Sequence, residues 1–170
     1  PRSTDLAFLI APLCEAHRLL GGEAWRRAAE KAGRVYADRH LSMREPYWGG
    51  TLDASCEDKE GAFAALQAFV AIHDVTGDPE HLRWAEHACD VVLSYVVVWD
   101  IDLPPGRLRN HGFKTRGWTV VSAQNQHIDA FGVLIAPDIL RLARKLGRAD
   151  LERLAIVMYR SCGQLMDPWG

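Results

Sequence analysis

The stretch TLDASCEDKEGAF, residues 51–63, places four carboxylates within eight positions, directly before an apolar run. They are Asp53, Glu57, Asp58 and Glu60. Ser55 and Asp58 have the spacing of a capping box, and acidic residues suit the positive end of a helix dipole. Carboxylates also carry out general acid and base catalysis. The stretch therefore has two interpretations: the start of a helix, and part of an active site.

A second set of polar and aromatic side chains lies between residues 98 and 132. It comprises Trp99, Asp100, Asp102, His111, Arg116, Trp118, Gln124, Asn125, His127 and Asp129. Indole faces stack on sugar rings, whereas amides and carboxylates hydrogen-bond to hydroxyl groups. Because the set contains neither a metal-binding motif nor a phosphate-binding loop, it favours a neutral or uronic sugar and predicts no metal or cofactor.

The same residues also have structural interpretations, which stay open at this point. Trp99 and Trp118 could anchor a long loop by burying their large side chains. The pair His127 and Asp129 could cap or orient the start of a helix. The aspartates at 100 and 102 could belong to a turn before the prolines that follow.

Composition narrows the class of protein. The chain has 170 residues, of which 48% are apolar and 25% charged, as is typical of one globular domain. Its net charge is −2, with both signs mixed along the same segments, which excludes an electrostatic surface for nucleic acid or an anionic membrane. The four cysteines, at positions 14, 56, 89 and 162, show no C-x-x-C spacing and fit neither a zinc site nor a disulfide framework.

A repeated pattern predicts an all-α fold of three helical hairpins. In each repeat an apolar segment, a glycine turn and an amphipathic helix follow one another, with turns at Gly21, Gly77 and Gly147. The segments before the turns, 6–14, 62–72 and 131–140, are apolar on nearly all sides, which predicts buried inner helices alternating with outer ones. Pro12 and Pro137 are expected to kink the inner helices or to mark their starts.

The connections from outer to inner helices are long, at residues 42–57 and 99–125, with a third beginning at Asp167. Loops of this length in a compact domain are usually functional. Because antiparallel helices place all the long loops at one end, Trp48 and the carboxylates before residue 60 are expected to lie at the same end as residues 99–125. Residues 96–101 and 118–121 are rich in β-branched and aromatic side chains, and Pro104 and Pro105 supply a turn between them. A short β-hairpin is therefore expected in the 99–125 loop.

The hairpin pattern, the phrase GDPEHLRWAEHACDVVL, and the phrases SCEDKEGAFAALQAFVAIHDVTGD and RGWTVVSAQNQHID resemble the six-hairpin glycosidase superfamily, without assigning a specific family. The resemblance implies an (α/α)6 toroid with a sugar pocket at its loop end. It implies Asp58 and Asp129 as acid and base, with Glu57 and Asp102 as substitutes. The implied substrate contacts are Arg116 to a carboxylate, Trp99 and Trp118 as walls, and Gln124, Asn125, His111 and Trp48.

Three hairpins are half of such a toroid. We therefore expect residues 1–170 to be a fragment of a larger toroid, completed by a missing half or by a homo-oligomer partner. The leading hypothesis is a glycoside hydrolase acting on a poly- or oligosaccharide, with uronic-acid-containing glycans favoured by Arg116. The alternatives are a sugar epimerase using His111 and His127 as bases, and a non-catalytic carbohydrate-binding layer.

Overall fold

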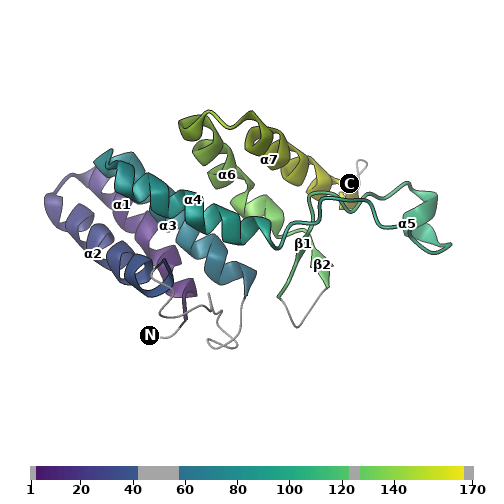
Figure 1. The fold of residues 1–170 in the computed structure, drawn as a ribbon, viewed down its shortest axis with the longest axis horizontal. Helices are drawn as coiled ribbons and strands as arrows, with labels where there is room; N and C mark the ends of the chain where they lie inside the picture. Colours follow the sequence, from purple (N-terminus) through teal and green to yellow (C-terminus); the bar gives the residue numbers. More distant parts are fainter. Residues whose placement is uncertain (1–2, 42–57, 123–126, 167–170) are drawn as a thin grey trace. The chain divides into compact units, whose positions relative to one another are not determined.

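The computed structural model describes residues 3–41, 58–122 and 127–166 and is mostly helical (Figure 1). This confirms the predicted all-α class. The chain divides into two compact units. Unit 1 comprises Pro1–Ser94 and Ser122–Gln124, and unit 2 comprises Tyr95–Val121 and Asn125–Gly170. The (α/α)6 toroid stays a prediction.

Unit 1 consists of a 3-10 helix and four α-helices. In chain order they are η1 (Asp5–Leu9), α1 (Ile10–Leu20), α2 (Glu23–His40), α3 (Lys59–Thr76) and α4 (Pro79–Leu93). Helix α1 packs on α2, and α3 packs on α4. Gly77 ends α3 in the left-handed conformation, as predicted, with φ 67°. Gly21 also has a positive φ, 72°, but its ψ of −174° is extended, so the first turn is of another type.

Helix α3 forms the core of unit 1. Residues 61–66 and 68–72 are all buried, because α3 contacts η1, α1, α2 and α4. Its alanines let neighbouring helices approach closely, and at Gly33 of α2 an added Cβ would lie 2.3 Å from Cδ1 of Ile72. Helix α1 differs from the expected inner helix. Its buried residues are Ile10 and Cys14, whereas Leu20 is 75% exposed, since fewer elements surround α1.

Unit 2 is built from a helical pair and a small sheet. Its elements are α5 (Arg107–Asn110), β1 (Thr119–Val120), β2 (Ile128–Asp129), α6 (Gly132–Leu146), α7 (Ala149–Cys162) and a 3-10 helix, η2 (Gly163–Leu165). Helices α6 and α7 pack together across Gly147, whose φ is 67°. Pro12 lies in the first turn of α1 in unit 1, whereas Pro137 lies inside α6.

The small sheet agrees with the expected β-hairpin in part. Val96 forms an antiparallel bridge with Thr119, and the amide of Val97 donates to the carbonyl of Trp118 at 2.8 Å. Residues 96–97 therefore pair with 118–119, within the segments expected to form strands. The regular partner of β1 is β2, which pairs antiparallel with it and was not expected from the sequence.

The segment 114–117 is held against α7 and η2. Gln164 accepts from the amide of Lys114 at 2.8 Å and donates to its carbonyl at 2.9 Å, as a strand neighbour would. The hydroxyl of Ser161 donates to the carbonyl of Arg116. Gly117 has φ 86°, and an added Cβ would lie 2.9 Å from Cα of Met158. Glycine at 117 therefore allows this close approach, which positions the side chains of Lys114 and Arg116.

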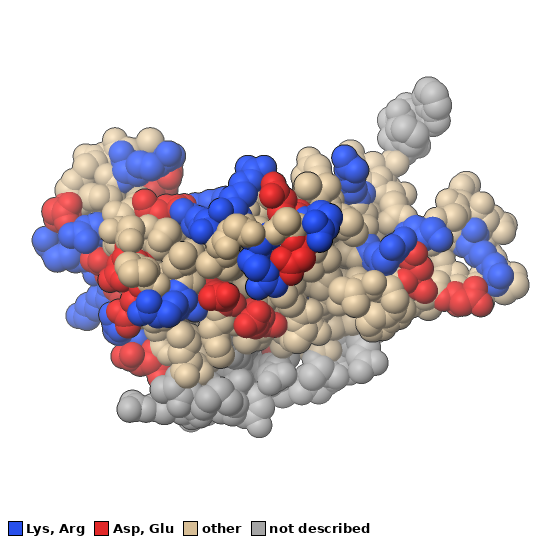
Figure 2. Space-filling model, turned by 45° about the horizontal axis from the view of Figure 1, so that its top comes forward, with Lys and Arg blue, Asp and Glu red and all other residues tan. Residues whose placement is uncertain are grey.

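Charged side chains of both signs are interspersed on the face shown in Figure 2, in line with the net charge of −2. None of the described helices combines the length and hydrophobicity needed to cross a bilayer.

Candidate functional site

Asp58 is the N-cap of helix α3, close to the predicted helix start, although the predicted capping box would place Asp58 three residues after the cap. Its backbone is extended, with φ −139° and ψ 136°, and its Oδ1 accepts from the amide of Glu60 at 2.9 Å. An isolated antiparallel bridge to Ser122 also holds its backbone. Ser55, the other member of the capping box, lies outside the described residues. Asp58 is therefore a helix cap.

The neighbouring Glu60 has an unusual protonation behaviour. Burial, followed by a hydrogen bond with Asp58 and the negative charge of that residue, raises the pKa of Glu60 from 4.5 to about 7. A helix N-terminus favours the charged form by only about 0.3–1 kcal/mol, less than one pKa unit. Burial and Asp58 therefore outweigh the helix dipole. Near neutral pH a large fraction of Glu60 is protonated and donates a hydrogen bond to Asp58.

Unit 1 contains further buried polar side chains. The side chain of Lys59, between the two acids in sequence, is fully buried. Thr4 and His40 are also fully buried, and Oγ1 of Thr4 lies 2.9 Å from Nε2 of His40. The negative charge of Asp5 further raises the pKa of Glu60. Because buried charges are costly unless they have partners, this end of α3 contains an electrostatically constrained group of side chains.

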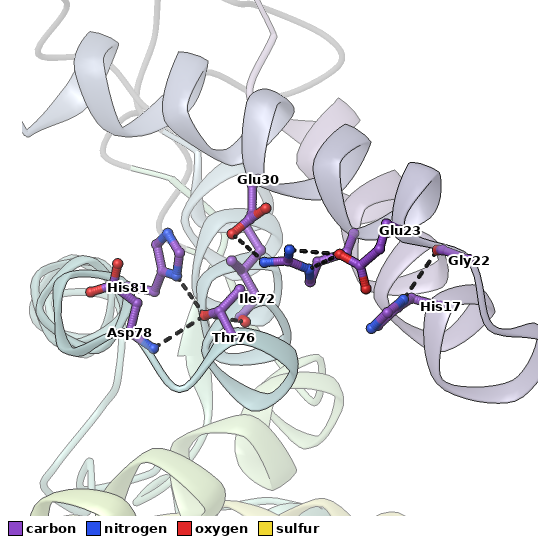
Figure 3. A network of polar contacts seen from close by, with 9 residues as sticks. His17, Gly22, Glu23, Glu30, Ile72, Thr76, Asp78 and His81 are labelled. Carbon is purple, nitrogen blue, oxygen red and sulfur yellow. Dashed lines mark hydrogen bonds and ion pairs between the residues drawn. The ribbon is translucent and has the colours of Figure 1, made fainter.

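The turns between paired helices of unit 1 carry a different kind of polar network (Figure 3). The hydroxyl of Thr76 donates to the carbonyl of Ile72 at 2.9 Å, so Nδ1 of His81, at 2.8 Å, is the donor to that hydroxyl. Burial lowers the pKa of His81, which favours this neutral form. Arg26 and Glu23 form an ion pair of 2.6 Å. These contacts pair polar side chains with neighbours that are close in sequence, and they stabilise the helix ends.

Unit 2 contains a cavity of about 480 Å³ beside the segment 114–117. Its charged lining residues are Lys114, Arg116 and Arg160, and its apolar ones are Val97, Val98, Leu154 and Val157. Asp100 lies near two of the cations: its Oδ2 is 3.0 Å from Nε of Arg116 and 4.0 Å from Nζ of Lys114. The cations lining the cavity therefore outnumber the carboxylates that pair with them.

The two predicted wall tryptophans have different environments. Trp99 is 60% exposed and follows Val98 of the cavity lining. Trp118 is buried and packs edge to face on Phe113, with ring centroids 5.0 Å apart. Within the described part of the chain, its indole Nε1 has no hydrogen-bond partner. Trp99 is therefore accessible to a ligand, whereas Trp118 contributes to the packing of unit 2.

Other predicted site residues of unit 2 are mostly at the surface. His111, Asp102 and His127 are exposed, and Oδ1 of Asp102 lies 3.7 Å from Arg109. Oδ1 of Asp129 accepts from Oγ1 of Thr119 at 2.8 Å and from the amide of Phe131 at 3.1 Å. Asp129 therefore orients the chain entering α6, one of the two roles considered from the sequence.

The predicted acid and base belong to different units, Asp58 to unit 1 and Asp129 to unit 2. Arg116 and Asp100 are brought together within unit 2. The predicted residues Trp48, Glu57, Gln124 and Asn125 lie outside the described residues.

Three residues with functional potential were not predicted from the sequence. Glu60 was interpreted only as part of a helix start, although an acid two positions after a cap and directly before an apolar run is a usable signal. Lys114 and Arg160 gave no such signal, because their positions beside the cavity depend on contacts between distant segments.

Within residues 3–41, 58–122 and 127–166, no three His, Cys, Asp or Glu side chains converge as metal ligands would. Burial raises the pKa of the Cys14 thiol to about 11, which keeps it protonated and unreactive.

Comparison with family models, curated proteins and solved structures finds no match to this chain.

Proposed function

We propose that the protein is a glycoside hydrolase-like enzyme acting on a poly- or oligosaccharide, with Glu60 as its general acid. The observation that carries the proposal is the Glu60 carboxyl, which has a pKa of about 7 and is hydrogen-bonded to Asp58. Glycoside hydrolysis requires a carboxylic acid that remains protonated near neutral pH and donates its proton to the leaving oxygen. Glu60 has this property and is only half-buried, so a substrate can reach it.

Asp58 has a supporting role in this mechanism. Two catalytic carboxyl groups are about 5–5.5 Å apart in retaining enzymes and about 6.5–9.5 Å apart in inverting ones. A carboxyl hydrogen-bonded to Glu60 is closer than either distance. Asp58 therefore holds the proton on Glu60 before transfer, and the second catalytic carboxylate is another residue. The sequence alone predicted Asp129, Asp102 and Glu57 as further catalytic carboxylates, and these stay predictions.

The resemblance to the six-hairpin superfamily supports the same class of reaction. The proposed architecture is an (α/α)6 toroid of which this chain supplies part, completed by further helical hairpins or by a second copy. The alternation of helices joined at Gly77 and Gly147 is compatible with this architecture.

The test is a screen for turnover with chromogenic glycosides and with acidic and neutral polysaccharides, followed by matched variants. Glu60→Gln is expected to reduce turnover at least about 100-fold, since general acid catalysis contributes about 10²–10⁴-fold. Glu80→Gln is the control, because Glu80 occupies the same position relative to a capping aspartate but lies in an exposed ion pair. Activity should fall as the pH rises through 7, where Glu60 loses its proton.

Equal activity of Glu60→Gln and the parent protein would overturn the assignment of the acid. Asp129→Asn, Asp102→Asn and Glu57→Gln, measured in the same assay, identify the second carboxylate. Loss of turnover in only one of them, with an unchanged melting temperature, assigns it.

A second candidate function is carbohydrate binding without catalysis. The observation that favours it is that Oδ1 of both Asp58 and Asp129 accepts a backbone amide, as a structural cap does. The exposed indole of Trp99 would then stack on a sugar ring. Saturable binding of an oligosaccharide with no release of reducing ends would favour this function over hydrolysis.

A further inference from the structure

The cavity of unit 2 has an excess of positive charge. Lys114, Arg116 and Arg160 line it, and Asp100 is the carboxylate that pairs with two of them. Three positive charges and one negative charge leave a local charge of about +2. Low-dielectric walls strengthen such a field inside a concave surface. The cavity is therefore suited electrostatically to an anion.

Arg160 differs from the other arginine of the lining. Arg116 forms an ion pair of 3.0 Å with Asp100, whose Oδ1 also accepts from the Arg116 amide at 3.4 Å. Arg160 has neither an ion pair nor a side-chain hydrogen bond in the described part of the chain. Its guanidinium is a planar donor that matches the oxygens of a carboxylate or phosphate. Arg160 is therefore the side chain available to bind an anionic group directly.

The remaining walls are apolar. Val97 and Val98 line one side of the cavity, and Leu154 and Val157 of α7 line another. A bare inorganic ion would leave these walls in contact with water. A ligand that carries its negative charge on a ring or short carbon chain would instead cover them, and the cavity volume of about 480 Å³ accommodates such a molecule.

The shape of the cavity is fixed by contacts that do not involve Arg160. Gln164 holds both backbone groups of Lys114, and Gly117 lies against the backbone of Met158. The site is thus preformed, which reduces the entropy lost on binding. Arg160 can be replaced without removing any of these contacts.

We propose that this cavity is a binding site for a small sugar-sized organic anion, with the guanidinium of Arg160 as its principal contact and Lys114 as an auxiliary cation. The anionic group is a carboxylate or a phosphate ester, which share the oxygens that a guanidinium recognises. The site lies within unit 2, whereas Glu60 lies in unit 1, so the inference does not depend on the proposed hydrolase activity.

The experiment is a calorimetric titration at low ionic strength with D-glucuronate, glucose 6-phosphate and glucose. The neutral sugar is expected not to bind, and at least one anion is expected to bind with a Kd in the millimolar range or tighter. Arg160→Ala is expected to weaken that binding at least about tenfold. Arg153→Ala is the matched control, since Arg153 is an exposed arginine of the same helix that does not line the cavity.

A second variant tests the charge of the cavity without changing Arg160. Val98→Glu places a negative charge at an exposed position of the lining and is expected to weaken anion binding as strongly as Arg160→Ala. Preferential binding of glucuronate identifies a carboxylate site, and preferential binding of glucose 6-phosphate identifies a phosphate-ester site. Equal binding of glucose, no binding of either anion, or unchanged binding in both Arg160→Ala and Val98→Glu would overturn the proposal.

Discussion

Helices α3 and α4 begin with the same local chemistry. In α3 the order is Asp58, Lys59, Glu60, and Oδ1 of the aspartate accepts from the glutamate amide at 2.9 Å. In α4 the corresponding aspartate is Asp78, and its Oδ1 accepts from the amide of Glu80 at 2.8 Å. Two acids in equivalent helix positions can therefore be compared directly.

The pKa values of the two glutamates move in opposite directions. Burial and Asp58 raise the pKa of Glu60 to about 7. A hydrogen bond from Arg34 lowers the pKa of Glu80, and both terminal nitrogens of the guanidinium, Nη1 and Nη2, donate to its carboxylate, at 2.8 and 3.0 Å. Arg34 is also held over the ring of Trp84, 4.5 Å from its centroid. The cap is determined locally, whereas the charge state depends on residues that are distant in sequence.

The largest expected difference between the two helix starts comes from the residue between the cap and the glutamate. Lys59 is fully buried, so Lys59→Met removes a buried positive charge beside Asp58 and Glu60 and should lower the free energy of unfolding by about 3 kcal/mol. Pro79→Ala at the equivalent position should change it by less than about 1 kcal/mol. Urea unfolding at pH 7 measures both. A Lys59→Met variant as stable as the parent protein would contradict the expected role of this charge.

The next effect is a pH dependence of stability with opposite sign in the two helices. Because the folded-state pKa of Glu60 is raised, its stabilising contribution is complete below pH 4.5 and is lost as the pH rises to about 7. The loss is on the order of 1–2 kcal/mol, reduced by solvent screening of a partly exposed carboxyl.

Glu60→Gln should abolish this part of the pH dependence, measured by urea unfolding between pH 4.5 and 8. Glu80→Gln serves as the control and should leave the same pH range unaffected. A Glu60→Gln profile parallel to that of the parent protein would show that Glu60 titrates normally.

The contrast between local determinants and contacts distant in sequence also explains how much of the fold could be predicted from the sequence. Glycine turns at Gly77 and Gly147 depend on local conformation, and the positive φ expected there is observed. The burial of α3 follows from its segment 62–72, which is apolar on nearly all sides. The exposure of Leu20 and the pairing of β1 with β2 depend on which distant segments surround them. Periodicity alone does not carry that information.

The features of the candidate site also fall into those determined locally and those that depend on distant residues. A helix start near Asp58 was predictable from the local acidic residues, although the capping box predicted a cap three residues earlier. The raised pKa of Glu60 was not, since it depends on burial and in part on Asp5, far away along the chain. The cavity of unit 2 likewise depends on Gln164, which binds Lys114 across a separation of 50 residues. Spacing within a short motif therefore predicted the backbone but not the electrostatics.

Substitutions of Asp58 have a smaller expected effect, and they distinguish its role as a helix cap from the effect of its negative charge. Asp58→Ala and Asp78→Ala should each cost about 1 kcal/mol of stability, because each leaves a helix amide without its acceptor. Asp58→Asn should retain most of the cap but remove a negative charge, and so lower the pKa of Glu60. Carbon-detected NMR titration of the Glu60 carboxyl measures that pKa. An unchanged pKa in Asp58→Asn would mean that burial alone accounts for the shift.

The smallest effect concerns the exposed ion pair of α4. Glu80→Gln should reduce stability at pH 7 by about 0.2–1 kcal/mol, since the side chains of Arg34 and Glu80 are 49% and 36% exposed. Because the folded-state pKa of Glu80 is lowered, its contribution is present above pH 4.5 and is lost as the pH falls. High salt should reduce the difference between Glu80→Gln and the parent protein, whereas the difference caused by Lys59→Met should persist because that charge is buried. If both variants responded equally to salt, this would contradict the conclusion that the start of α4 has a solvated ion pair and the start of α3 has a buried charge.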